Sequence, residues 1–139
     1  MNSSLLAALA VTLVASGCAV TEPYAEVSGE RTSRADSYEE RVIVMGVDGK
    51  LDLTGSESTT IEPRPQVVVL ASVRKDRRGK LSSKTVTLNA KACLRYTFAA
   101  RHERMTEIHP WQLVLKNVEP IPECVAKFPD HAPQPMVGG

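Results

Sequence analysis

Aromatic residues and net charge are both in short supply in this chain. Phe, Tyr and Trp together make up 4% of its 139 residues, and the formal net charge is +1. That balance gives no global electrostatic field that would steer the chain to nucleic acid or to an anionic surface. The sequence therefore predicts no nucleic-acid partner.

The apolar run near the start of the chain is too short to cross a membrane. Residues 5–15 span about 16 Å as a helix, which is half of the roughly 30 Å core of a bilayer. Such a run followed by the small residues Ala15, Ser16 and Gly17 is typical of a secretion signal. An ordinary cleaved signal peptide and a buried core helix are the two alternatives.

Cys18 follows these small residues directly, and the segment resembles the lipobox of bacterial lipoproteins. The resemblance implies that residues 1–17 are removed as a lipoprotein signal peptide and that Cys18 carries acyl chains such as palmitate. Two or three chains hold a small domain at a membrane, since each buried methylene contributes about 0.8 kcal/mol. Ala19, rather than Asp, comes next, as in Gram-negative lipoproteins that reach the outer membrane. We therefore expect an envelope protein at the outer membrane, facing the periplasm.

Cysteine is rare as well: only Cys93 and Cys124 accompany Cys18. Export to an oxidising compartment makes these two a candidate disulfide, whereas a reducing compartment would leave two unpaired thiols. A loop of about thirty residues closed in this way corresponds to roughly 3.5 to 4 kcal/mol in the chain-entropy model.

The remaining chain is long enough for one domain and too short for two. Residues 18–39 are polar without a sustained apolar period, and we expect the lipidated cysteine and a flexible linker there. Residues 40–125 carry the folded domain. Residues 126–139 are rich in proline, and we expect a disordered tail.

Short β-type runs, separated by turn signals about every ten residues, fill the domain, and no segment shows a helical period. The Asp48-Gly49 pair favours a type I′ turn. Residues 67–73 form a nearly continuous apolar run, which is typical of a central strand. Residues 84–90 alternate cleanly, with Val86 and Leu88 facing inward. The pattern predicts an all-β fold, an antiparallel two-sheet sandwich of about seven strands.

Two further runs predict strands with distinct faces. Ile43, Met45 and Val47 share one face of the run 41–47, and Leu94, Tyr96 and Phe98 share one face of the run 93–100. A final strand is expected over residues 111–118. The prolines that follow lack a backbone N–H and end its hydrogen bonding to the neighbouring strand.

The order of these motifs resembles the PEGA-like lipoproteins of proteobacteria, whose small sandwich domains are similar to immunoglobulin or transthyretin folds. The resemblance covers roughly residues 40–124 and is carried by residues 47–50, 61–63 with 67–70, 86–90 with 93–96, and 111–124. It implies a fold and an envelope setting, without a known reaction.

Few residues are candidates for catalysis or metal binding. His102, Glu103, Glu107 and His109 lie in one short segment, where two imidazoles and a carboxylate would suit zinc. The alternative is that these four residues belong to an ordinary surface loop. Cys93 with His102 as its base would make a catalytic thiol, but Cys124 offers Cys93 a structural partner. We expect no catalytic residue, no metal and no cofactor.

One basic segment is the best candidate for surface contacts. Its cations surround a single aspartate and would meet lipid phosphates or acidic cell-wall groups at about 1 kcal/mol each. A solvated loop whose charges discourage aggregation is the alternative. The cations are Arg74, Lys75, Arg77, Arg78 and Lys80.

Together these features predict a non-catalytic envelope lipoprotein. Its membrane contact is the lipid anchor, and its β domain acts as an interaction or structural module for an envelope protein, for example by strand addition or as an inhibitor of a periplasmic enzyme. The alternative is a metal-binding or hydrolytic periplasmic protein that uses the His102–His109 loop.

Overall fold

The computed structural model describes residues 20–29, 38–103 and 111–133. Cys18, Glu107 and His109 lie outside these ranges. Within them the chain is mostly β-strand, and no helix there is long and apolar enough to cross a membrane. The elements are β1 (Ala25–Gly29), β2 (Glu39–Val47), β3 (Lys50–Ser56), β4 (Ser58–Ile61), β5 (Pro65–Lys75), β6 (Leu81–Asn89), β7 (Leu94–His102), β8 (Trp111–Pro120), the helix α1 (Pro122–Lys127) and the 3₁₀ turn η1 (Pro129–His131).

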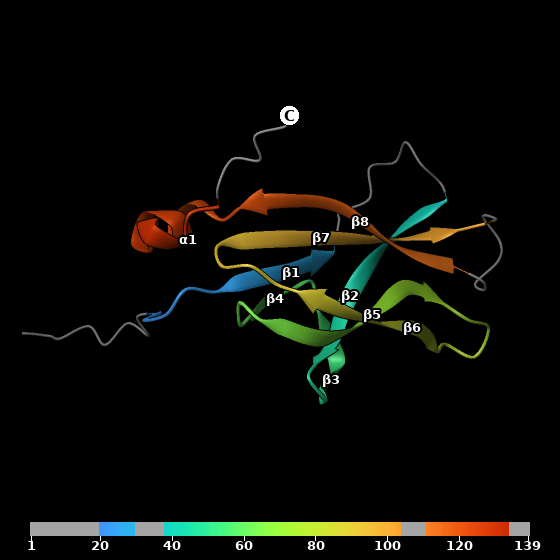
Figure 1. The fold of residues 1–139 in the computed structure, drawn as a ribbon. Coiled ribbons are helices and arrows are strands. Elements are labelled where there is room, and N and C mark those ends of the chain that lie inside the picture. The colour runs from blue at the N-terminus through green and yellow to red at the C-terminus, as the bar shows by residue number, and fades with distance from the viewer. Residues whose placement is uncertain (1–19, 30–37, 104–110, 134–139) are drawn as a thin grey trace, which may run out of the picture.

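The eight strands are connected by hydrogen bonds in the order β4-β1-β7-β2-β5-β6, with β3 added to β2 and β8 added to β7. Strand β2 joins the two halves (Figure 1). Its first residues, 39–41, pair with β7, whereas the later residues pair with β5 on one side and β3 on the other. All pairs are antiparallel except β1 with β7, which is parallel. The sheet is therefore mixed.

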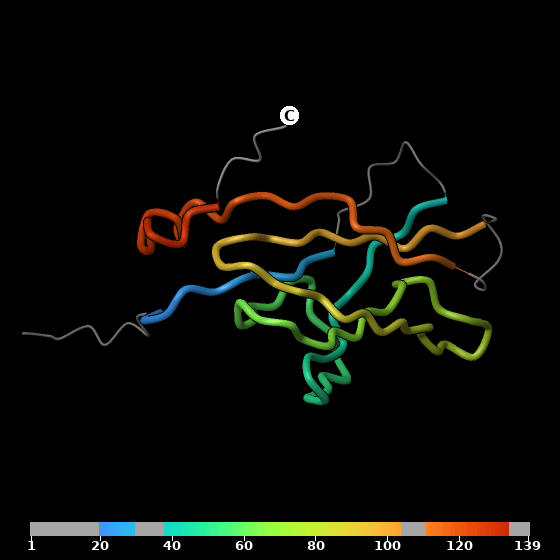
Figure 2. The backbone as a smooth tube through the Cα atoms, viewed as in Figure 1, coloured from blue at the N-terminus to red at the C-terminus, as the bar shows by residue number. Residues whose placement is uncertain are grey.

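A β-bulge between Val44 and Gly46 lies in the part of β2 that pairs with β3 and β5. Figure 2 shows the β2 backbone changing direction between the two halves. Gly46 is needed here because a Cβ on this residue would lie 2.9 Å from the backbone oxygen of Lys50. The bulge and the glycine together set the path of the β2–β3 hairpin, a geometry that is common where a strand must bend.

Side chains from both halves form one hydrophobic core. The half that contains β7 contributes Tyr96 and Phe98, and the half that contains β5 contributes Val68 and Leu70. Trp111, at the start of β8, is buried in the same cluster, and its indole Nε1 donates a hydrogen bond to the Ser82 hydroxyl at 2.8 Å. Burial of this shared core stabilises both halves together.

The β-rich fold expected from the sequence is confirmed, and several of its elements lie where the patterns placed them. Asp48 and Gly49 both have positive φ, as a type I′ turn requires. Strand β5 is central, since it pairs with both β2 and β6. Leu88 is buried on β6, and Val86 is partly buried against the same core.

The finer fold prediction is not confirmed. The described residues form eight strands rather than about seven, and the parallel β1–β7 pair departs from an antiparallel arrangement. The sequence placed Ile43, Met45 and Val47 on one face of β2, but Val47 packs against the core with Val42 and Val44, while Ile43 and Met45 are only partly buried. The bulge between Val44 and Gly46 interrupts the alternation on which that assignment depended.

Two segments expected to lack structure are ordered where the structure describes them. Residues 25–29 of the expected linker form β1, whose Ala25 and Val27 are buried between β4 and β7. Residues 126–133 of the expected tail include the end of α1 and η1. Short polar strands of this kind are stabilised by tertiary pairing rather than by their own apolar period.

Candidate functional site

Cys93 and Cys124 are joined as the sequence predicted, with an S–S distance of 2.07 Å and a Cα–Cα distance of 5.2 Å. The bond lies in a small second cluster with Ile121, which is also buried. The backbone N–H of Cys93 donates to the Tyr24 carbonyl just before β1. The disulfide therefore anchors α1 at the start of β7 and close to the chain that enters β1.

His102 is a core residue and not part of an exposed loop. It ends β7, its side chain is 1% exposed, and its Nε2 lies 2.9 Å from the Ser72 hydroxyl. Its ring stacks against Trp111 with the centroids 6.2 Å apart. The expectation that the segment 102–109 is a surface loop is wrong for His102, because this residue is the last of strand β7. Among the described residues no group of three metal-ligating side chains is present.

The basic segment is divided between a strand and a turn. Arg74 and Lys75 belong to β5, and the Arg74 guanidinium forms a 2.7 Å ion pair with Glu40. Asp76 organises the following turn, where its carboxylate accepts the backbone N–H groups of Arg78 and Lys80 at 2.8 Å. Arg74 is paired with Glu40 of the same chain. The five cations expected to contact an anionic surface are therefore not equally available for that contact.

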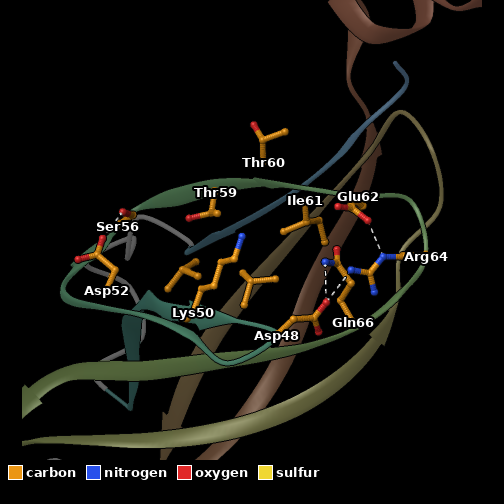
Figure 3. A pocket seen from close by; sticks show the side chains of 13 residues that line it. Asp48, Lys50, Asp52, Ser56, Thr59, Thr60, Ile61, Glu62, Arg64 and Gln66 are labelled. Carbon is orange, nitrogen blue, oxygen red and sulfur yellow. Dashed lines mark hydrogen bonds and ion pairs between the residues drawn. The ribbon is translucent and has the colours of Figure 1, made fainter. Parts of the chain in front are cut away.

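A hollow of about 410 Å³ lies between the β2–β3 hairpin and the chain that runs from β4 into β5 (Figure 3). Val44, Val47 and Ile61 supply apolar surface to it, while Lys50 and Gln66 supply polar groups. The volume falls in the lower part of the usual range for small-ligand sites, about 300–1,000 Å³.

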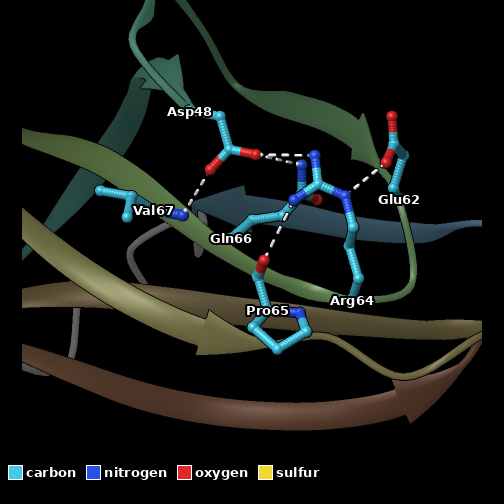
Figure 4. A network of polar contacts seen from close by, with 6 residues as sticks. All are labelled: Asp48, Glu62, Arg64, Pro65, Gln66 and Val67. Atoms are coloured by element: carbon cyan, nitrogen blue, oxygen red, sulfur yellow. Dashed lines mark hydrogen bonds and ion pairs between the residues drawn. The ribbon is translucent and has the colours of Figure 1, made fainter.

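Four of the residues that line this hollow, Asp48, Glu62, Arg64 and Gln66, form a polar network (Figure 4). The Asp48 carboxylate accepts hydrogen bonds from the Val67 backbone N–H at 2.8 Å, from Gln66 Nε2 at 3.0 Å and from Arg64 Nη2 at 2.9 Å. These donors, the Val67 N–H first and then Gln66, lower the pKa of Asp48 below its ordinary value of 3.8. The carboxylate is therefore charged at neutral pH, and it accepts three hydrogen bonds.

Arg64 links this network to β4. Its Nε donates to Glu62 at 2.5 Å, and its Nη1 donates to the Pro65 carbonyl at 3.2 Å. The contact with Glu62, followed by the contact with Asp48, raises the pKa of the guanidinium. Arg64 thus cross-links the β2–β3 turn to the β4–β5 connection.

The exposed surface next to the hollow is apolar on β3. The side chains of Leu51 and Leu53 are 65% and 86% exposed, and β3 pairs with β2 alone among the described strands. Large apolar side chains on an unpaired strand edge are typical of an interaction surface, since soluble proteins otherwise avoid them.

Sequence reasoning missed the roles of Glu62, Arg64 and Gln66. The only local signal was that Arg64 precedes a proline, which restricts its backbone to extended conformations. Its pairing with Asp48 depends on the β2–β5 register, which the sequence alone does not define.

No family model, no curated protein and no solved structure matches this chain.

Proposed function

We propose that the chain is a non-catalytic envelope lipoprotein, anchored through lipid at Cys18, whose β domain binds an extended segment of an envelope protein. The observation that carries the binding role is the exposed Leu51 and Leu53 pair on β3, a strand that pairs with β2 alone among the described strands. A partner strand added to this edge would satisfy backbone groups and cover both leucines. Burying two such side chains contributes about 1.5–3 kcal/mol each.

The proposed envelope location is supported by the disulfide. The Cys93–Cys124 bond is buried with Ile121 and links α1 to β7. Structural disulfides of this kind persist in oxidising compartments. Together with the small-residue segment before Cys18, this favours an exported protein held at the outer membrane and facing the periplasm.

We also propose that the two halves of the sheet act as the two layers of a sandwich, similar to those of the PEGA-like lipoproteins. The support is the single core to which β5 and β7 both contribute. The alternative function, metal binding or hydrolysis by the His102–His109 loop, is not favoured by any described residue, since the His102 side chain is buried against Ser72.

Fractionation tests the anchor. The natural chain should stay with the membranes after a carbonate wash and should incorporate labelled palmitate. A Cys18→Ser variant should be released and should remain unlabelled. A natural chain that is soluble and unlabelled would contradict the proposal.

Photo-crosslinking in intact cells tests the partner strand. A crosslinking residue placed at Leu53 should give one adduct of discrete mass. Combined Leu51→Ser and Asp52→Lys changes, which alter the same edge, should abolish the adduct. Leu115→Ser with Val118→Ser on β8 is the matched control, because these side chains are also exposed, at 46% and 42%. Absence of the adduct, or equal loss in the control, would overturn the binding role of β3.

A further inference from the structure

The backbone of β3 faces away from its neighbour β2 at Leu51. The Asp48 N–H donates to the Val67 carbonyl on β5 at 2.8 Å, so the Val47 carbonyl of the same trans peptide points the opposite way, towards β3. Val47 pairs with Lys50, whose backbone groups accordingly face β2. Because this direction alternates along a strand, the N–H and C=O of Leu51 face outward.

The two faces of this strand differ in chemistry. Residues 50–54 are all exposed, and β3 pairs with β2 alone within the described part of the chain. Lys50 and Asp52 line the hollow, whereas Leu51 and Leu53 do not, as the alternation of side chains requires. A strand added to this edge therefore meets two leucines on one face and one charge of each sign on the other.

The β3 strand of a second copy matches this edge in one register. A two-fold axis perpendicular to the sheet keeps each face on its own side, so leucines meet leucines and charges meet charges. Pairing centred on Lys50 or on Asp52 would place two like charges directly opposite each other, which is destabilising.

The two leucines are the remaining centres. Pairing centred on Leu53 would extend the ladder onto Gly55, whose φ of 72° departs from a regular strand. Pairing centred on Leu51 places Lys50 of each copy opposite Asp52 of the other, and it sets the two Leu51 side chains side by side. The edge is therefore self-complementary in charge in this register alone.

We propose that β3 pairs with β3 of a second copy of this chain, antiparallel and centred on Leu51. Such a ladder is small beside a standard interface of about 1,600 Å². Attachment of both copies to one membrane compensates for this by raising their effective concentration. The inference deepens the proposed function, since it names the partner of β3, and it rests on that function for the anchor and for the use of this edge.

Single cysteine substitutions in membranes that carry the full chain test the register. Leu51→Cys should give a disulfide-linked dimer on mild oxidation, because the two Cα atoms would lie about 5.5 Å apart, within the span of a disulfide. Leu53→Cys is the matched control, since this position is also exposed but would lie about 14 Å from its counterpart along the strands. No dimer from Leu51→Cys, or an equal yield from Leu53→Cys, would overturn the proposal.

Reversal of single charges tests the pairs between the copies, with Leu51→Cys as the reporter. Lys50→Asp should reduce the dimer about tenfold, because two attractive pairs become repulsive. Asp52→Lys should do the same, and a mixture of the two chains should restore the dimer, since an acidic edge then meets a basic one. Lys80→Asp, beside the opposite edge strand β6, should leave the yield unchanged.

The Lys50→Asp variant is decisive because it leaves the hydrogen bonds from Thr54 and Ser56 to Asp52 in place. An unchanged dimer yield in this variant would overturn the charge pairing even if Asp52→Lys disturbs the hairpin. A urea midpoint equal to that of the natural chain checks that the variant is folded.

The mass of the photo-adduct at Leu53 separates this inference from the proposed function. An adduct of twice the chain mass supports the second copy. An adduct with a different protein, without a dimer from Leu51→Cys, refutes the second copy and leaves the binding role of β3 intact. Absence of both the adduct and the dimer refutes the binding role as well.

Discussion

Asp48 and Arg64 form a 2.9 Å ion pair across sixteen residues of chain. Asp48 lies in the β2–β3 turn, and Arg64 lies in the connection before β5. The pair therefore ties together the two segments that border the hollow. Because Asp48 also accepts the Val67 backbone N–H, its side chain anchors the turn to β5.

Replacement of Asp48 should destabilise the fold in a defined order. Asp48→Ala removes every side-chain contact and places Ala at a positive φ of 48°, which is unfavourable for a residue with a Cβ. Asp48→Gly removes the same contacts, but glycine adopts a positive φ without strain. Asp48→Asn keeps an acceptor and tolerates the conformation. We expect urea midpoints to fall in the order Asn, Gly, Ala, with Ala lowest.

The urea midpoints of these variants also test the two assumptions behind the expected order. If Ala and Gly give equal midpoints, the positive φ is not maintained in the folded chain. If all three variants match the natural chain, the Asp48 network contributes nothing to stability.

Acid should weaken the fold partly through Asp48. Its pKa in the folded chain lies below the ordinary 3.8, chiefly because of the Val67 N–H. The stabilisation is therefore complete above 3.8 and is lost as the pH falls through the lower folded value. Asp52 behaves in the same way, since Thr54 lowers its pKa. Urea midpoints measured from neutral pH to about pH 3 should decline less steeply in Asp48→Gly than in the natural chain. Parallel curves would exclude this linkage.

Loss of the disulfide should cost much of the stability of a small domain. The bond closes a separation of 31 residues, which corresponds to roughly 4 kcal/mol in the chain-entropy model. A Cys93→Ala and Cys124→Ala double variant and the reduced natural chain should unfold at similar, lower urea concentrations. The double variant should also be insensitive to reductant. If reductant leaves the natural chain unchanged, the two cysteines are not bonded in solution.

His102 should matter for stability and not for zinc binding. His102→Ala removes a buried ring and leaves the Ser72 hydroxyl without that partner, which should cost roughly 2–4 kcal/mol. His131→Ala changes an exposed position and should leave the melting temperature unchanged. Zinc should not raise the melting temperature of the natural chain. A zinc-dependent rise that disappears in His102→Ala would instead support the metal-binding alternative.

The sequence predicted those strands whose residues determine their own geometry. Asp48 and Gly49 specify a turn through the positive φ that both adopt. Tyr96 and Phe98 alternate with polar residues, and both are buried on β7. In these places the local pattern and the tertiary structure impose the same requirement.

Other features depended on contacts between distant segments. Strand β1 has only five residues and is held by β4 and β7, so its own composition resembles that of a linker. The six-residue helix α1 is too short to show a period, and Pro122, expected only to end a strand, begins it. The hollow depends on the register between β2 and β5, which brings Asp48 beside Gln66 and Val67.

Strand β2 belongs to both halves of the sheet, and this affects how the domain unfolds. Residues 39–41 complete one half, and the residues that follow complete the other. Severing the chain after β2 would remove an interior strand from both halves, so neither fragment should fold alone. Unfolding should accordingly be a single cooperative transition in which both halves are lost together.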